Sequence, residues 1–478
     1  MSRRGAWRLG YARGSPCELL QPCDRVSGAF LMETNSVLAD DRIGAEAAIS
    51  SSSRSGLFLL ICPSMRDDRE LARFDQGELT VLRHEYASIE LEYMVGAGEA
   101  AGHIRDPLEE VEVILASVDG QAVTGVISTD DYPGSVLACI VAERLGLPAP
   151  KPAVNLLCQH KFQARVAQRA FVPEAVPAFA QVDVTQLRAL PTGLSMPAFV
   201  KPVKSFFSIG AGRVTSQDDL SSAQARWAGM TQFFRPFERI LEAYTPYTVG
   251  SNLLLVEEAL CGVQVTLEGY ARGDHVYILG IVDSIMYPDT IAFERFEYPS
   301  SLPEPVQQRM GEITRRLMRG IGYQDGMFNI EFMYDPETQA IRIIEVNPRM
   351  ASQFADLYEK VDGASSYQIV LDLASGVEPR WSRGQGSYAF AASCVLRTFE
   401  DMVVRSLPGG KTIRDVEALF PGCRIELFGQ EGRPLSEEMQ DGHSYRYACI
   451  NLGGSDRTDV LAKLEQCRQR WGLELERL

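Results

Sequence analysis

The chain has 478 residues and a formal net charge of −16, from 47 basic and 63 acidic side chains. Hydrophobic residues make up 45% of it, which excludes an intrinsically disordered protein, and the length suffices for about three domains. The acidic balance argues against nucleic-acid binding, because affinity for the phosphate backbone comes from clustered Lys and Arg.

No hydrophobic run approaches the ~20 residues of a membrane span, so we expect a soluble, cytoplasmic protein that binds no membrane. The ten cysteines include no CxxC pair, which indicates reduced thiols rather than a disulfide framework or a zinc site. The five histidines show no metal-ligand spacing.

The N-terminal part of the chain divides into a predicted tail, residues 1–55, and an α/β domain, residues 56–153. The tail is basic at its start and ends in a linker-like SSSRSG. Short apolar runs in the domain predict strands, and a helix closed by Gly146 follows them; the strands are expected near 57–62, 111–117 and 122–128. GAGEAAG at 96–102 is only a weak match to a dinucleotide fingerprint.

The central part of the chain, residues 154–384, alternates helix and strand patterns. A helix is expected from about Asn155, and another from Pro305 to Gly320, with Val306, Met310, Ile313 and Leu317 on one side. The predicted strands cover 196–203, 253–260, a hairpin that turns at 272–274, 326–334 and 340–348. Residues 385–478 are patterned separately, with strands near 388–397 and 445–452 and a final helix. LPGGKT at 407–412 is not a phosphate-binding loop, because Arg405 stands where its first glycine should be.

Polar residues interrupt the last two strands of the central part. Side chains alternate faces along a strand, so Glu345 and Asn347 share one face, and Glu331 lies on the polar face of its own strand. If the two strands are neighbours, two carboxylates and an amide oxygen converge. Such an all-oxygen set suits Mg²⁺.

A lysine, Lys201, ends a predicted strand just before the small-residue loop KSFFSIGAGR. A lysine beside such a loop can hold a phosphate by charge while backbone N–H groups bind its oxygens. A solvent-directed lysine beside an ordinary hairpin turn is the competing interpretation.

The ordered motifs HKFQAR, FVKPV…SIGAG, VEEAL, GMFNIEF and IIEVNPR resemble the ATP-grasp superfamily, and within it the carboxylate–amine ligases of the L-amino acid ligase and carnosine synthase kind. The resemblance covers about residues 57–478. It implies an α/β ATP-grasp fold with a Rossmann-like pre-ATP-grasp domain, a core whose lid spans about 190–256, and a small C-terminal α+β domain. It also implies ATP and Mg²⁺ (or Mn²⁺) as cofactors.

The resemblance assigns roles by position. Lys161 and Lys201 would contact the α- and β-phosphates, and Arg349 would bind the substrate carboxylate and the acyl phosphate. Glu331, Glu345 and Asn347 would hold the metal. The remaining nucleotide contacts would come from the lid and the hinge: Ser208, Ile209, Gly210, Glu257, Glu258 and Leu260.

The implied reaction is ATP-dependent formation of an amide or peptide bond between a small carboxylate, an amino acid or a related acid, and an amine, with release of ADP and phosphate. Gln264 stands where many relatives have a ribose-binding acid, and Glu268 is a possible substitute. Ser352 and Gln353 stand where biotin carboxylase has a glutamate base, which disfavours bicarbonate activation. A biotin-carboxylase-like enzyme and a non-catalytic nucleotide-binding module are the alternatives.

Several features of the reaction stay open at this stage. The acid and the amine are not identified, and Phe206, Phe207, Glu294 and Arg295 line the substrate site or serve only in packing. Asp356 and Glu359 are candidate bases for the amine, although a place on the solvent face of a helix explains them as well. A homodimer is a family-level expectation.

Overall fold

The computed structural model describes residues 55–74, 79–86, 106–204, 210–227, 235–248, 253–437 and 444–478. Residues 1–54 of the predicted tail, the GAGEAAG segment, Phe206, Phe207, Ser208 and Ile209 lie outside these ranges. Ser53–Met286 and Ala292–Leu478 form one compact unit, and Tyr287–Ile291 fall in a second one. Within the described ranges, no helix has the length and apolar character needed to cross a bilayer.

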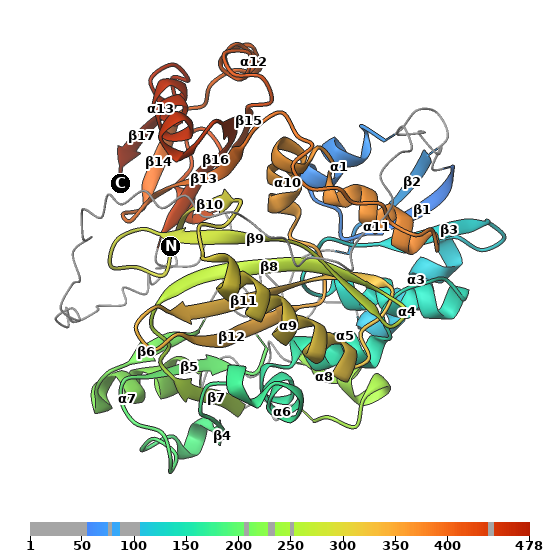
Figure 1. Cartoon of the computed structure of the whole chain (residues 1–478), viewed down its shortest axis with the longest axis vertical. Helices are drawn as coiled ribbons and strands as arrows, with labels where there is room; N and C mark the ends of the chain where they lie inside the picture. The colour runs from blue at the N-terminus through green and yellow to red at the C-terminus, as the bar shows by residue number, and fades with distance from the viewer. Residues whose placement is uncertain are drawn as a thin grey trace, which may run out of the picture. The chain divides into compact units, whose positions relative to one another are not determined.

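A three-stranded parallel sheet, in the order β2-β1-β3, opens the described chain (Figure 1). Its strands and helices are β1 (Gly56–Ile61), α1 (Met65–Leu71), β2 (Leu79–His84), α3 (Pro107–Ser117), β3 (Val123–Ile127) and α4 (Gly134–Leu145). The parallel strands and flanking helices agree with the predicted Rossmann-like arrangement. Gly146 ends α4 in the left-handed conformation, with φ 70°, as its sequence position predicted.

The predicted strand at 111–117 is wrong, because this segment is part of α3. Asp106 caps the helix by accepting a hydrogen bond from the Leu108 N–H, and Pro107 occupies the first turn, where a missing N–H costs nothing. Two glutamates in the first turn favour the same helix through its dipole. These start signals outweigh the β-branched residues of the run.

An eight-stranded antiparallel sheet, in the order β12-β11-β8-β9-β10-β13-β16-β15, is the largest sheet of the described residues. Its strands are β8 (Val263–Arg272), β9 (His275–Met286), β10 (Phe293–Tyr298), β11 (Gly326–Asp335), β12 (Ala340–Asn347), β13 (Phe390–Thr398), β15 (Arg424–Leu427) and β16 (Tyr445–Gly454). The predicted hairpin is confirmed by the pairing of Arg272 with His275. Because β10 pairs with β13, the sheet continues across the expected domain boundary at 384.

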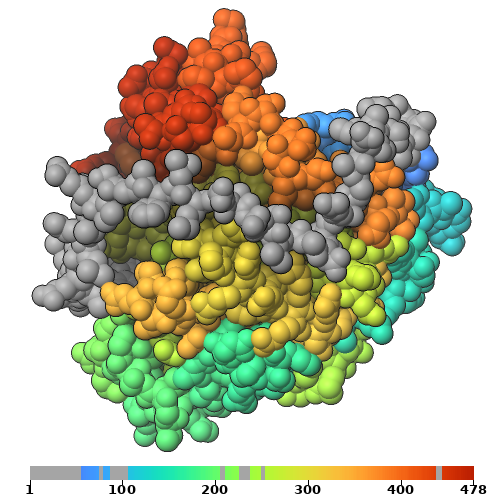
Figure 2. All heavy atoms as spheres, viewed as in Figure 1, coloured from blue at the N-terminus to red at the C-terminus, as the bar shows by residue number. Residues whose placement is uncertain are grey.

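One face of this sheet is apolar and is covered by α9 (Glu304–Gly320), which Figure 1 shows lying along β8 and β9. The predicted stripe of α9 is buried in this core, where each large side chain contributes roughly 1.5–3 kcal/mol. It packs against Phe328, Ile330 and Phe332 of β11. The outer side of α9 is exposed, and Figure 2 shows this region, in yellow, at the surface.

A smaller four-stranded sheet, in the order β4-β7-β5-β6, carries the lysine of the predicted lid lobe. The elements between α4 and the eight-stranded sheet are α5 (Pro152–Gln159), α6 (Lys161–Phe171), η2 (Pro173–Ala175), β4 (Phe179–Asp183), η3 (Val184–Gln186), β5 (Ala198–Pro202), β6 (Gly212–Val214), α7 (Gln217–Trp227), α8 (Arg235–Tyr244) and β7 (Leu253–Glu258). The single helix expected from Asn155 is two helices, separated at His160. The sheet also includes β4, upstream of the predicted lid boundary at 190.

The other face of the eight-stranded sheet is covered in part by the helices that follow β12. These and the remaining C-terminal elements are η5 (Ser352–Phe354), α10 (Ala355–Asp362), α11 (Ser366–Ala374), β14 (Met402–Ser406), α12 (Gly410–Glu417), η6 (Leu435–Glu437), α13 (Arg457–Arg468) and β17 (Glu474–Arg477). An ionic cluster links α10, α1 and β15: Arg424 contacts Glu70 at 2.5 Å, Asp356 at 3.0 Å and Glu359 at 3.0 Å.

Candidate active site

The pairing of β11 with β12 places two glutamates directly opposite each other. Glu331 is the partner of Glu345, and Asn329 is the partner of Asn347. Directly opposite residues of antiparallel strands have Cβ atoms about 5 Å apart, so the two carboxylates share one small region of the sheet. The strand pairing assumed in the sequence analysis is therefore present.

Amide side chains surround this glutamate pair. Asn347 Nδ2 donates to Asn329 Oδ1 at 2.9 Å and lies 3.4 Å from Glu331 Oε1, while Gln264 Nε2 donates to Glu331 Oε2 at 3.0 Å. Burial and the neighbouring Glu345 raise the pKa of Glu331 to about 7. A divalent cation bound between the two carboxylates would favour the ionised form of Glu331.

The donor set fits a cation that completes its shell with water and phosphate oxygens. The described residues contain no group of three or more His, Cys, Asp or Glu side chains that could hold a metal ion. Two carboxylates and an amide oxygen suit Mg²⁺, which usually keeps several waters and takes few protein ligands.

Lys161 reaches the glutamate pair from the break between α5 and α6. The Lys161 N–H donates to Val203 O at 2.8 Å, which fixes the start of α6 beside the end of β5. Lys161 Nζ lies 2.5 Å from Glu345 Oε2. This charge and that of Lys201 outweigh burial and keep the pKa of Glu345 below its usual value.

Lys201 lies in a buried ionic triad with Glu257 and Arg165. Its Nζ is 2.6 Å from Glu257 Oε2, and Arg165 binds the other oxygen of the same carboxylate. Arg165 also donates to Ile344 O at 2.7 Å, next to Glu345 on β12. Burial lowers the pKa of Lys201, so the shared carboxylate is what holds its charge in place.

Arg349 follows β12 and binds a residue that the sequence analysis did not single out. Its Nε lies 3.1 Å from Asp131 Oδ1, and Lys204 Nζ lies 3.2 Å from Asp131 Oδ2. Asp131 comes from the loop between β3 and α4. Asp131 is far in sequence from both Lys204 and Arg349, so no local sequence pattern could have identified these contacts.

The other predicted residues lie at varied distances from this centre. Glu268 is on the same face of β8 as Gln264 and is fully buried, with Oε1 accepting from the Ala351 N–H at 2.6 Å. Glu258 is exposed and accepts weakly from the Ala178 N–H. Gly210 has φ 71°, a conformation that favours glycine, and Leu260 follows β7.

The two candidate bases lie in the ionic cluster rather than beside Arg349. Asp356 is buried and binds Lys360 and Arg424, so the solvent-face interpretation is wrong for this residue. Glu359 binds Arg73 and Arg424. Arg295 is bound to both Glu294 and Glu297, which gives this arginine a structural role.

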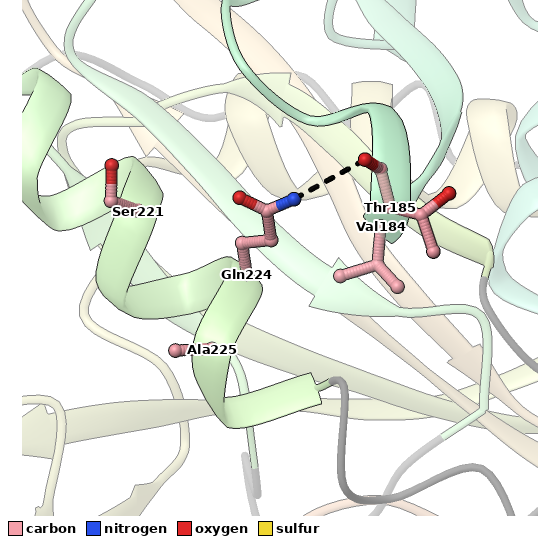
Figure 3. A pocket seen from close by; sticks show the side chains of 5 residues that line it. All are labelled: Val184, Thr185, Ser221, Gln224 and Ala225. Atoms are coloured by element: carbon pink, nitrogen blue, oxygen red, sulfur yellow. Dashed lines mark hydrogen bonds between the residues drawn. The ribbon is translucent and has the colours of Figure 1, made fainter.

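A surface pocket of about 390 Å³ lies beside α7, between this helix and η3 (Figure 3). Figure 3 shows the Gln224 side chain reaching toward Thr185, whose carbonyl oxygen it meets at 3.4 Å. The lining residues are Val184, Thr185, Ser221, Gln224 and Ala225. The pocket contains no ionisable side chain and no predicted site residue, so it offers no chemistry to the candidate active site.

Comparisons with known proteins identify the domain that contains these residues. Residues 194–356 match the model of an ATP-grasp domain, and this range contains both strands of the glutamate pair. This part of the chain is therefore an ATP-grasp domain. It is superimposable on the crystal structure of L-amino acid ligase from Bacillus licheniformis with a TM-score of 0.69 and 16% identity, over 89% of this chain and 99% of that one. The predicted ATP-grasp fold is confirmed.

Two curated proteins are similar to the chain at the sequence level. D-alanine–D-alanine ligase of Rhodococcus erythropolis is 23% identical over 306 residues, which are 59% of this chain and 77% of the relative. An uncharacterized protein of Sinorhizobium fredii is 24% identical over 302 residues. The match covers 62% of this chain but only 57% of that relative, so the chain spans little more than half of its length.

The ionic triad predicts a large loss of stability when its carboxylate is removed. In Glu257→Gln, Arg165 and Lys201 lose their shared counter-charge while their side chains stay 2% and 7% exposed. We expect the free energy of unfolding to fall by about 3–5 kcal/mol, measured by urea denaturation. The neighbouring, exposed Glu258→Gln is the matched control and should change it by no more than about 0.5 kcal/mol. Equal urea midpoints for the two variants would contradict the triad's role.

Proposed function

We propose that the protein is an ATP-dependent ligase that activates a small carboxylate, an amino acid or a related acid, as an acyl phosphate and joins it to an amine, releasing ADP and phosphate. One observation carries the proposal: a pair of carboxylates and two cations lie at one place. Glu345 is paired with Glu331 and bound by Lys161, and Arg349 follows the strand that carries Glu345. Two anions, a carboxylate and a terminal phosphate, must meet during such a reaction. Cations and a metal site at one place offset their repulsion.

ATP and Mg²⁺ are the proposed cofactors. Glu331, Glu345 and Asn347 would hold Mg²⁺ (or Mn²⁺), and the metal would neutralise phosphate charge and polarise the transferred group. Lys161 and Lys201 would bind phosphate oxygens, and Gly210 would take part with the lid loop. The adenine would be bound at the hinge by Glu257, Glu258 and Leu260. The ribose hydroxyls would be bound by Gln264 or Glu268.

Arg349 would bind the substrate carboxylate and then the acyl phosphate made from it. The carboxylate oxygen attacks the γ-phosphorus, ADP leaves, and the amine nitrogen then attacks the acyl carbon and expels phosphate. The amine loses one proton in the second step. Exclusion of water by the lid would protect the acyl phosphate from hydrolysis.

The alternative of bicarbonate activation is disfavoured by the segment after Arg349. Ser352 Oγ accepts from Arg66 at 3.2 Å, and Gln353 Nε2 donates to Ser393 Oγ at 2.9 Å. Both side chains are therefore engaged with other elements, and neither is a carboxylate that could deprotonate bicarbonate. We place the reaction in the cytoplasm, with a homodimer as the expected assembly.

The test is phosphate release from ATP and Mg²⁺ across a panel of acids and amines, with products identified by mass spectrometry. The proposal requires release only when an acid and an amine are both present, together with a product whose mass equals their sum less one water. Turnover with bicarbonate and no amine would favour the carboxylase alternative. ATP binding without ADP formation across the whole panel would favour a non-catalytic module.

Removal of Arg349 should separate nucleotide binding from ligation. In Arg349→Ala we expect ATP affinity within about threefold of the wild type and amide formation lowered at least about 100-fold, since the guanidinium acts on the carboxylate and not on the nucleotide. Calorimetric ATP titration and product formation measure the two effects. Arg309→Ala, at an exposed position of α9, is the control and should retain full activity. A parallel loss of ATP affinity would contradict the assigned role.

The raised pKa of Glu331 predicts a pH-dependent requirement for Mg²⁺. Because the metal needs the carboxylate form, lowering the pH below about 7 makes Mg²⁺ compete with a proton. We expect the half-saturating Mg²⁺ concentration for phosphate release to rise about tenfold from pH 8 to pH 6. Glu331→Gln should need more Mg²⁺ at both pH values, with little difference between them. If the half-saturating Mg²⁺ concentration of Glu331→Gln depended on pH as strongly as that of the wild type, the titrating group would be a residue other than Glu331.

A further inference from the structure

The loop between β3 and α4 brings one acid, Asp131, into direct contact with the proposed carboxylate-binding arginine. The Asp131 and Arg349 side chains are each 23% exposed, so a ligand can reach both. Lys204, on the other oxygen of Asp131, is only 4% exposed. It is enclosed by Tyr132, whose ring centroid lies 5.0 Å from Lys204 Nζ, and by Phe237.

We propose that Asp131 is a specificity-determining residue that receives the ammonium group of the acid substrate, so that the protein prefers acids with an amino group next to the carboxylate. The inference rests on the proposed function, which gives the substrate carboxylate to Arg349. The inference adds a second contact with the substrate, made by the loop that follows β3. This loop lies outside residues 194–356, which match the ATP-grasp domain.

The ion pair itself has the form of a receptor for a zwitterion. Arg349 Nε and Asp131 Oδ1 present a cation and an anion 3.1 Å apart, and the charged groups of an α-amino acid are separated by one carbon atom. Such a ligand exchanges one ion pair for two: its carboxylate on Arg349 and its ammonium on Asp131. A carboxylate without an ammonium must displace Asp131 from Arg349 and then lie beside it as a like charge, which is unfavourable.

Lys204 fixes the charge and position of Asp131 for this role. Burial would raise the pKa of Asp131, but Lys204, Arg349 and Lys161 outweigh it and hold this pKa well below its usual range. Because Lys204 is enclosed by two aromatic rings, it cannot follow a ligand outward. Asp131 therefore keeps one cation behind it and offers its other oxygen to the site.

Neighbouring carboxylates are engaged elsewhere. Asp130 Oδ2 accepts from the Gly134 N–H at 2.8 Å, at the start of α4, and burial raises its pKa to about 7. Glu268 accepts from the Ala351 N–H and is fully buried. Among the described carboxylates, Asp131 is the one that combines an ion pair to Arg349 with access from outside.

The experiment compares matched pairs of acids with and without the α-amino group. Calorimetric titrations in the presence of Mg²⁺ and a non-hydrolysable ATP analogue use alanine and propanoate, leucine and 4-methylpentanoate, phenylalanine and 3-phenylpropanoate, and aspartate and succinate. The wild type should bind at least one amino acid about tenfold or more tightly than its partner. In Asp131→Asn this preference should fall to within about twofold, without weaker binding of the des-amino acid.

Asp131→Glu keeps the negative charge, so this variant should retain a preference for the amino acid over its des-amino partner. If Asp131 had only a structural role, the preference would not depend on this charge. Asp68→Asn, an exposed acid of α1 in the same N-terminal sheet region, is the control for charge removal and should behave as the wild type. Analogue binding and melting temperature identify any variant that fails to fold, and Asp131→Glu then carries the comparison.

The outcomes separate this inference from the proposed ligase activity. A wild type that prefers no amino acid of the panel over its partner overturns the inference, and so does an Asp131→Asn variant that folds and keeps the preference. Phosphate release with amines is measured in parallel. If the preference is present and Asp131-dependent but no amine yields a product, the ligase proposal fails while the assignment of Asp131 stands.

Discussion

The candidate site depends on one unfavourable contact, the pairing of Glu331 with Glu345 on adjacent strands. Two carboxylates opposite each other repel, and the fold contains them by surrounding them with charge of opposite sign. Lys161 binds Glu345 directly, and Arg165 and Lys201 share Glu257 close behind the same strand. In the proposed function the same cations bind the nucleotide phosphates, so the groups that offset this repulsion would also provide the affinity for phosphate.

The surrounding architecture explains how these groups are held. The apolar face of the eight-stranded sheet is packed against α9, which leaves the opposite face of β8, β11 and β12 to carry polar side chains. Segments distant in sequence then deliver the cations to this face: α6, β5 and the residues after β12. The N-terminal sheet contributes Asp131 to the same region. The candidate site is thus assembled from residues of several separate elements.

Much of the fold was predictable because its signals are local. The alternation of Phe328, Ile330 and Phe332 with polar residues, the hairpin at 272–274 and the glycine end of α4 each follow from a few neighbouring residues. The segment 111–117 was predicted wrongly because the helix start at Asp106 and Pro107 lies upstream of the run that suggested a strand. The break at His160 was not predictable, since the bond that fixes it reaches Val203, 42 residues away along the numbering. Lys204 and Asp131 were missed for the same reason: their significance comes only from tertiary contact.

The bond from the Lys161 N–H to Val203 O joins the first residue of α6 to the residue after β5, and Lys201 lies two residues before that acceptor. This bond fixes the backbone distance between the two lysines, because it joins the residue that carries one of them to a residue two positions from the other. In the proposed enzyme, that fixed spacing would set which two neighbouring phosphates the lysines can reach at the same time.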